Sequence, residues 1–146
     1  MTDLIEHPTA TYHTTAINEA GLVGESIITG KDQLVVKTAD PKDDDQGTNP
    51  EQLIGLALVT CLNATLEAIE KRNGYEHQSK VRADVYQAPD THGLQFFIDA
   101  TVYIPEDVIG HKKAQAMFEL AESRCPVAKL LGPSANVTFT LVNEWK

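Results

Sequence analysis

The feature that most constrains this chain is an apolar run without any charge, residues 53–62, which follows strong helix-start signals. Thr48 or Asn49 can cap a helix there. Pro50 suits the first helical position, and Glu51 favours the positive end of the helix dipole. A helix that is apolar on all sides needs cover on all sides, so we expect a buried central helix. One domain of this length offers little such cover, which favours a dimer that packs central helices between two sheets.

Stretches rich in β-branched and aromatic residues lie on both sides of this helix. Before it, residues 9–17, 22–29 and 33–37 have the composition of strands, and residues 30–32 would close a hairpin between the last two. After the helix we expect strands at residues 81–87, 94–104 and 137–142, a second helix at 106–122 and a short helix at 127–131. This order predicts an α+β fold in a single domain, residues 1–146, and not a βαβ winding.

The charge balance limits the classes of partner. The chain of 146 residues carries 21 acidic and 12 basic side chains, a net charge of −9. Such a surface repels phosphate backbones and anionic lipid, so we expect no nucleic-acid partner and no membrane partner. The N-terminus has no basic and apolar pattern of a signal peptide, and the most strongly apolar run is too short to span a bilayer. We therefore expect a soluble, cytoplasmic protein.

The chain has two cysteines, too few for a secreted disulfide framework. The five histidines are scattered and show no ligand spacing, so we expect neither a metal nor another cofactor. Taken alone, Cys61 inside the apolar helix resembles a buried core cysteine. Cys125 precedes a proline at the start of a short helix, where backbone N–H groups and Arg124 would favour a thiolate. A structural role for Cys125 stays equally open at this point.

Two motifs around these cysteines resemble those of the OsmC/Ohr family, the osmotically inducible and organic hydroperoxide resistance proteins. Residues 47–61, GTNPEQLIGLALVTC, are similar to the family's central-helix segment. Residues 123–132, SRCPVAKLLG, are similar to its second-cysteine motif. The order of elements and the overall length also agree, so the resemblance covers nearly the whole chain and is closer on the OsmC side.

The resemblance implies antiparallel sheets around a buried central helix in an intertwined homodimer. It implies that Cys61 is the peroxidatic thiolate, which reduces an organic hydroperoxide to an alcohol and becomes a sulfenic acid. Cys125 would then resolve the sulfenic acid as a Cys61–Cys125 disulfide. A dithiol reductant, either a lipoylated protein or a small thiol, would restore both thiols. An apolar pocket would select alkyl and fatty-acid hydroperoxides, but it also disfavours thiolates, so the family uses a cation to activate the nucleophile.

The chain departs from the family pattern at that cation. The family places an arginine in the N-terminal strand region, held by the glutamate that matches Glu51, and this chain has no arginine before Arg72. Three alternatives remain for the activation of Cys61: Lys31, Arg124 or no cation at all. A catalytically weak OsmC-like dimer that binds an apolar ligand is therefore the second hypothesis. A third is an acyl-transfer or hydrolase enzyme that uses Cys61.

Overall fold

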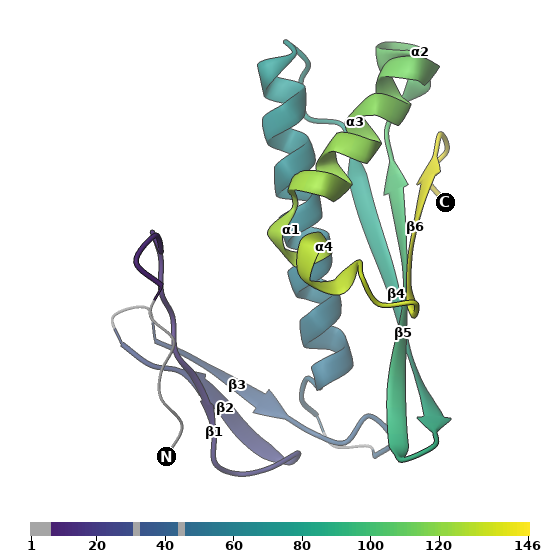
Figure 1. Ribbon diagram of the computed structural model, residues 1–146. Coiled ribbons are helices and arrows are strands. Elements are labelled where there is room, and N and C mark those ends of the chain that lie inside the picture. The colour runs from purple at the N-terminus through teal and green to yellow at the C-terminus, as the bar shows by residue number, and fades with distance from the viewer. Residues whose placement is uncertain (1–6, 31–32, 44–45) are drawn as a thin grey trace. The chain divides into compact units, whose positions relative to one another are not determined.

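The computed structural model describes residues 7–30, 33–43 and 46–146, and these divide into two compact units. The first unit is Met1–Asn49 and the second is Pro50–Lys146. Figure 1 shows a small sheet in the first unit and a long helix beside a second sheet in the other. The α+β class expected from the sequence is confirmed. The single domain of residues 1–146 stays a prediction.

The first unit holds a three-stranded antiparallel sheet in the order β1-β2-β3. Its strands are β1 (Ala16–Asn18), β2 (Gly24–Ile28) and β3 (Leu34–Thr38). The expected hairpin between the second and third strands is confirmed, although part of its turn lies outside the described residues. The expected first strand, residues 9–17, is wrong in extent. Its partner strand ends at Ile28, so residues 9–14 have no neighbouring strand to pair with within the described part of the chain.

The second unit holds a three-stranded sheet in the order β4-β5-β6, with the helices packed beside it. The strands are β4 (Lys80–Asp90), β5 (Gly93–Tyr103) and β6 (Val137–Val142). β4 and β5 form an antiparallel hairpin, but β6 runs parallel to β5. The expectation of purely antiparallel sheets is therefore wrong here. The three short helices between β5 and β6 form a crossover, and a crossover returns the chain in its original direction.

The helices of this unit are α1 (Pro50–Arg72), α2 (Glu106–Ile109), α3 (His111–Arg124) and α4 (Pro126–Leu131). The central helix begins at Pro50 as predicted, and Gly74, with φ of 81°, follows its end in a left-handed conformation. The expected helix over residues 106–122 is wrong in two respects. Gly110 has φ of 92° and separates α2 from α3, and α3 continues to Arg124. A positive φ ends a right-handed helix, and glycine adopts it at little cost.

The core of the second unit lies between α1, the sheet and helices α3 and α4. Leu58, Leu62 and Leu66 recur every fourth residue of α1 and are fully buried. Leu53 and Leu56 point elsewhere, and they are 38% and 61% exposed. Within this chain the central helix is thus buried along one face, which agrees with the expectation that one domain of this length offers little cover for it.

The length of α1 corrects the expectation that the apolar segment is too short to span a membrane. The helix has 23 residues and a mean hydropathy of 1.5 over its most apolar 18 residues, so by length and composition it could cross a membrane. The strongly apolar run is shorter than a membrane span, but the helix that contains it extends beyond it on both sides. The core helix of a small α+β protein has the same composition, and α1 packs on β4, α3 and α4. The fold is consistent with a soluble protein.

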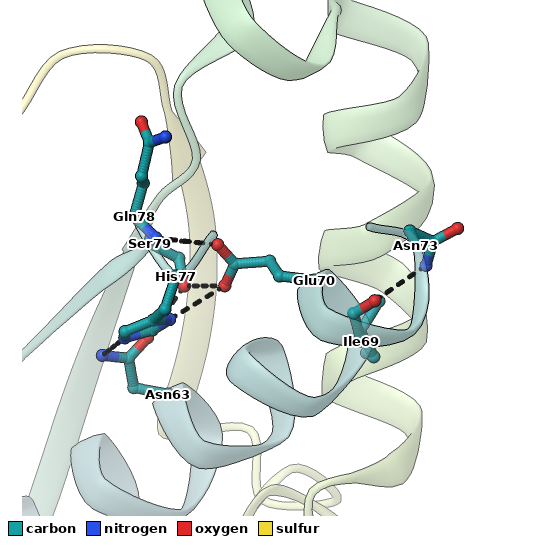
Figure 2. Close-up of polar contacts among 7 residues, drawn as sticks. All are labelled: Asn63, Ile69, Glu70, Asn73, His77, Gln78 and Ser79. Atoms are coloured by element: carbon teal, nitrogen blue, oxygen red, sulfur yellow. Dashed lines mark hydrogen bonds and ion pairs between the residues drawn. The ribbon is translucent and has the colours of Figure 1, made fainter. Parts of the chain in front are cut away.

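A buried carboxylate joins the end of α1 to the start of β4 (Figure 2). Glu70 is completely buried and accepts hydrogen bonds from Ser79 Oγ at 2.6 Å and from the backbone N–H of Gln78 at 2.9 Å. His77 Nδ1 lies 3.1 Å from the same carboxylate. The Glu70 backbone carbonyl accepts from the N–H of Tyr75. These contacts satisfy a charge that burial would otherwise penalise strongly.

We predict that Glu70→Ala lowers the free energy of unfolding by about 3 kcal/mol, because it leaves several buried donors without an acceptor. The measurement is urea unfolding followed by circular dichroism. Glu67→Ala, an exposed position on the same helix, is the matched control and should change stability by less than about 0.5 kcal/mol. Equal losses in the two variants would contradict a specific role for the buried carboxylate.

Candidate dithiol site

The first candidate residue, Cys61, lies in the middle of α1 and is partly buried. It packs against the edge of the core formed by the buried face of the helix. The Thr65 hydroxyl donates to the Cys61 carbonyl at 2.9 Å, so the backbone here is a regular helix with an additional side-chain contact. The cysteine therefore has a fixed backbone and a sulfur at the boundary between core and surface.

The second candidate, Cys125, occupies the junction between α3 and α4 and is 0% exposed. Its backbone N–H donates to the Ala121 carbonyl, which ends α3, and its carbonyl accepts from the Lys129 N–H, which begins α4. Its Sγ accepts from the Ala128 N–H at 3.4 Å, so the sulfur itself caps α4. The predicted position of Cys125 at the start of a short helix is confirmed.

The fold brings the two cysteines together although 63 residues lie between them in the sequence. Both are free thiols; Cys61 packs against the core cluster that contains Cys125, and its side chain contributes to the pKa of Cys125. Burial raises the pKa of Cys125 most, the Ala128 N–H lowers it, and the hydrogen bond and charge of Cys61 raise it further. The net pKa is above the ordinary value of 9.0.

That direction corrects the expectation that Cys125 favours a thiolate. The sequence shows the helix start and Arg124, and both would favour negative charge on the sulfur. The structure adds the burial of the thiol, and desolvation outweighs the backbone hydrogen bonds. Arg124 is exposed, whereas Cys125 points into the core. Cys125 is therefore held as a neutral thiol.

Glu51, the third residue singled out by the sequence, lies at the start of α1. Its Oε2 accepts from Gln87 Nε2 at 3.5 Å, a long contact between α1 and β4. Ten residues of helix separate Glu51 from Cys61, a rise of roughly 15 Å. The structure thus joins the two cysteines and places Glu51 away from them along the helix. Gln87 was not singled out, because nothing in the sequence pairs the middle of a strand with the start of a distant helix.

Glu51 also lines a groove of about 440 Å³ between α1 and β4. The groove has an apolar floor and a polar end where Glu51 and Gln52 lie. The residues around it are Glu51, Gln52, Gly55, Leu56, Val59, Ala83 and Val85. Gly55 permits the close approach of the two elements, since a Cβ there would come within 3.3 Å of Val85.

The cation that would activate Cys61 stays a prediction. Lys31 lies outside the described residues, and Arg124 is exposed. The ion pairs found in residues 7–30, 33–43 and 46–146 do not include Glu51. In the same part of the chain, no three His, Cys, Asp or Glu side chains gather in a group that could hold a metal ion.

The fold and the adjoining thiols define an α+β protein with a dithiol site. A model of the OsmC-like proteins matches residues 42–140, a span that includes both cysteines and α1. The chain belongs to the OsmC-like protein family. The family resemblance seen in the sequence is therefore confirmed.

Individual relatives agree with this assignment. An organic hydroperoxide resistance protein-like chain of Staphylococcus aureus is 29% identical over 136 residues, which cover 89% of this chain and 94% of that one. A crystal structure from Lactobacillus casei, of a protein provisionally named a redox protein, is 43% identical, covers 94% of both chains and has a TM-score of 0.84. The organic hydroperoxide resistance protein OhrB of Bacillus subtilis has the same fold, with 23% identity, a TM-score of 0.74 and coverage of 91% and 100%.

We predict that the raised pKa of Cys125 makes the protein less stable at alkaline pH. Above the pKa of an exposed thiol the unfolded chain loses this proton while the folded chain keeps it. The contribution is therefore fully present below pH 9.0 and is lost as the pH rises toward the folded-state pKa. Urea unfolding at a series of pH values measures it. Cys125→Ala should lose this part of the alkaline dependence, and an unchanged dependence in the variant would refute the prediction.

Proposed function

We propose that this protein is a thiol-dependent peroxidase that reduces organic hydroperoxides to alcohols. The observation that supports it most is the contact between two free thiols of unequal burial, Cys61 at the edge of the core and Cys125 inside it. The names of the relatives, organic hydroperoxide resistance and redox proteins, point to the same chemistry. The proposed substrates are alkyl and fatty-acid hydroperoxides.

The reaction would begin at Cys61. Its thiolate attacks the terminal oxygen of the hydroperoxide, an S–O bond forms, the O–O bond breaks, and the alkoxide leaves and is protonated to the alcohol. Cys61 is then a sulfenic acid. The Cys125 sulfur attacks the Cys61 sulfur, water leaves, and a Cys61–Cys125 disulfide results. The packing of Cys61 against the core cluster that contains Cys125 supports this second step, since disulfide formation needs the Cβ atoms to come within roughly 4.5 Å.

The cycle would close with a dithiol, a lipoylated protein or a small thiol, which takes the oxidising equivalents from the disulfide. No resident cofactor is needed in this scheme. We also propose that the protein works as a homodimer in the cytoplasm. The exposed apolar side of α1, with Leu53 and Leu56, supports a second copy as its cover, because large exposed apolar surfaces are uncommon in monomers.

We predict that Cys61→Ser lowers the consumption of cumene hydroperoxide by roughly a thousandfold, because it removes the nucleophile. Stopped-flow measurement with excess dithiol tests this. Cys125→Ser is the paired variant, and it should still complete the first turnover and then hold a sulfenic acid that dimedone traps. If Cys61→Ser consumes the peroxide as fast as wild type, the proposed function is wrong.

Glu51 is proposed to assist the same reaction by orienting the cation that activates Cys61. We predict that Glu51→Gln lowers kcat/KM for cumene hydroperoxide by roughly tenfold, the effect of losing a positioning carboxylate. Its pH–rate profile should also shift to higher pH, which a merely structural role would not cause. Glu67→Gln, also on α1 and exposed, is the control. Identical rates and profiles in the two variants would remove Glu51 from the mechanism.

The second candidate function is an OsmC-like dimer of low catalytic power that binds an apolar ligand. The groove between α1 and β4 favours it, because its floor is apolar and its volume of about 440 Å³ suits a small molecule. Titration of a fatty acid, followed by calorimetry on the Cys61→Ser protein, separates the two ideas. Tight binding without peroxide turnover in the wild type would favour this candidate over the peroxidase.

A further inference from the structure

The two sulfurs of the site differ in how a second molecule can reach them. Cys125 is 0% exposed and belongs to the buried core cluster together with Leu62 and Ala128. Cys61 is partly exposed and packs against the outside of that cluster. Thiol–disulfide exchange requires the attacking sulfur to approach in line with the S–S bond, so access to each sulfur controls the rate.

In a single chain, the helix surface next to Cys61 is exposed. Ala57 and Ala64 lie about one helical turn on either side of Cys61, and both are exposed and small. Residues 53–66 contain no charged side chain, so this stretch of the helix itself places no charge beside Cys61. Cys125 offers no equivalent route, because the elements on both sides of it close over its sulfur.

From this difference we infer that the reductant attacks the sulfur of Cys61, and that Cys125 is always the sulfur that leaves. The inference rests on the proposed function, since it concerns the Cys61–Cys125 disulfide of that cycle. It assigns Cys61 two roles, attack on the peroxide and formation of the mixed disulfide with the reductant. Cys125 forms a disulfide with no sulfur other than that of Cys61.

Reduction of the disulfide takes two exchange steps. A reductant thiolate bonds to Cys61 Sγ, the Cys61–Cys125 bond breaks, and its electron pair leaves with Cys125 as a thiolate. The second thiol of the reductant then attacks the reductant's own sulfur in the mixed disulfide and releases Cys61 as a thiolate. The proton that this second thiol gives up is taken by Cys125. The reductant becomes a cyclic disulfide, and the protein regains two reduced cysteines.

The surroundings of Cys125 suit a leaving group that is never exposed. The Ala128 N–H points at its sulfur from 3.4 Å and would stabilise the thiolate at the moment of departure. Burial acts in the opposite direction and favours the protonated thiol, so the thiolate is short-lived and takes up a proton. A buried neutral thiol is poorly nucleophilic toward outside molecules, and this limits wrong mixed disulfides at Cys125.

The test locates the first bond to a reductant in the wild-type protein. The disulfide is made with diamide, so that the experiment does not depend on peroxide turnover. The oxidised protein is mixed briefly with mercaptoethanol, quenched in acid, unfolded and alkylated with N-ethylmaleimide. Peptide mass spectrometry then identifies the sulfur that carries mercaptoethanol. We expect it on Cys61, with N-ethylmaleimide on Cys125, in at least about a tenfold excess over the reverse pattern.

Single-cysteine variants give an independent measurement. Methyl methanethiosulfonate should modify Cys61 in the Cys125→Ser protein at least about tenfold faster than it modifies Cys125 in the Cys61→Ser protein. Both rates should become equal in urea, which shows that folding causes the difference. If Cys125→Ser does not fold, the wild-type labelling still decides the question.

The possible outcomes separate the two proposals. Mercaptoethanol on Cys125, or equal labelling of both cysteines, overturns this inference and leaves the peroxidase proposal untouched. Failure of diamide to form the disulfide also overturns it. Absence of peroxide turnover overturns the proposed function, whereas labelling on Cys61 would still establish which sulfur of the pair an outside thiol attacks.

Discussion

The packing of one face of α1 against the second sheet and against α3 and α4 is the interaction on which the rest of the structure depends. Leu58, Leu62 and Leu66 provide the buried contacts of the helix, and each fully buried leucine contributes roughly 1.5–3 kcal/mol. Cys61 immediately precedes one of these leucines, so the rotation that buries Leu62 also sets the sulfur at the edge of the core. The same packing holds the junction that carries Cys125 next to it. The dithiol site is therefore a consequence of how the core is filled.

Two carboxylates at opposite ends of α1 differ in burial and in hydrogen bonding. Glu70 is completely buried near the C-terminal end of the helix and has several hydrogen-bond donors around it (Figure 2). Glu51 is half-buried at the other end, and its contact to Gln87 is long. A fully satisfied carboxylate stabilises the fold and has no capacity left for other partners. Within the described part of the chain, Glu51 lies beside a groove and makes a long contact, so its carboxylate could still hold a cation or a ligand.

The two thiols, like the two carboxylates, differ in how deeply they are buried. In a reactive pair, one thiol must be reachable by substrate and the other must wait without reacting. The protein achieves this by burial and by backbone geometry, with Cys125 closed inside the junction of α3 and α4 and Cys61 at its boundary. The chain reaches this arrangement without the N-terminal arginine of the family pattern. Under the proposed function, the activation of Cys61 is consequently the step in which this protein would differ most from the family pattern.

The features that neighbouring residues encode can be predicted from the sequence: the start of the central helix at Pro50, the strand segments of the second unit and the cysteine at the start of α4. Capping, propensity and periodicity act over a few residues, so a single stretch of sequence contains them. The parallel pairing of β6, the one-sided burial of α1 and the contact between the thiols required the tertiary structure, because each joins residues far apart in the chain. The raised pKa of Cys125 also could not be predicted from the neighbouring residues. Its local sequence favours a thiolate, but the desolvation that opposes one comes from the packing of distant elements.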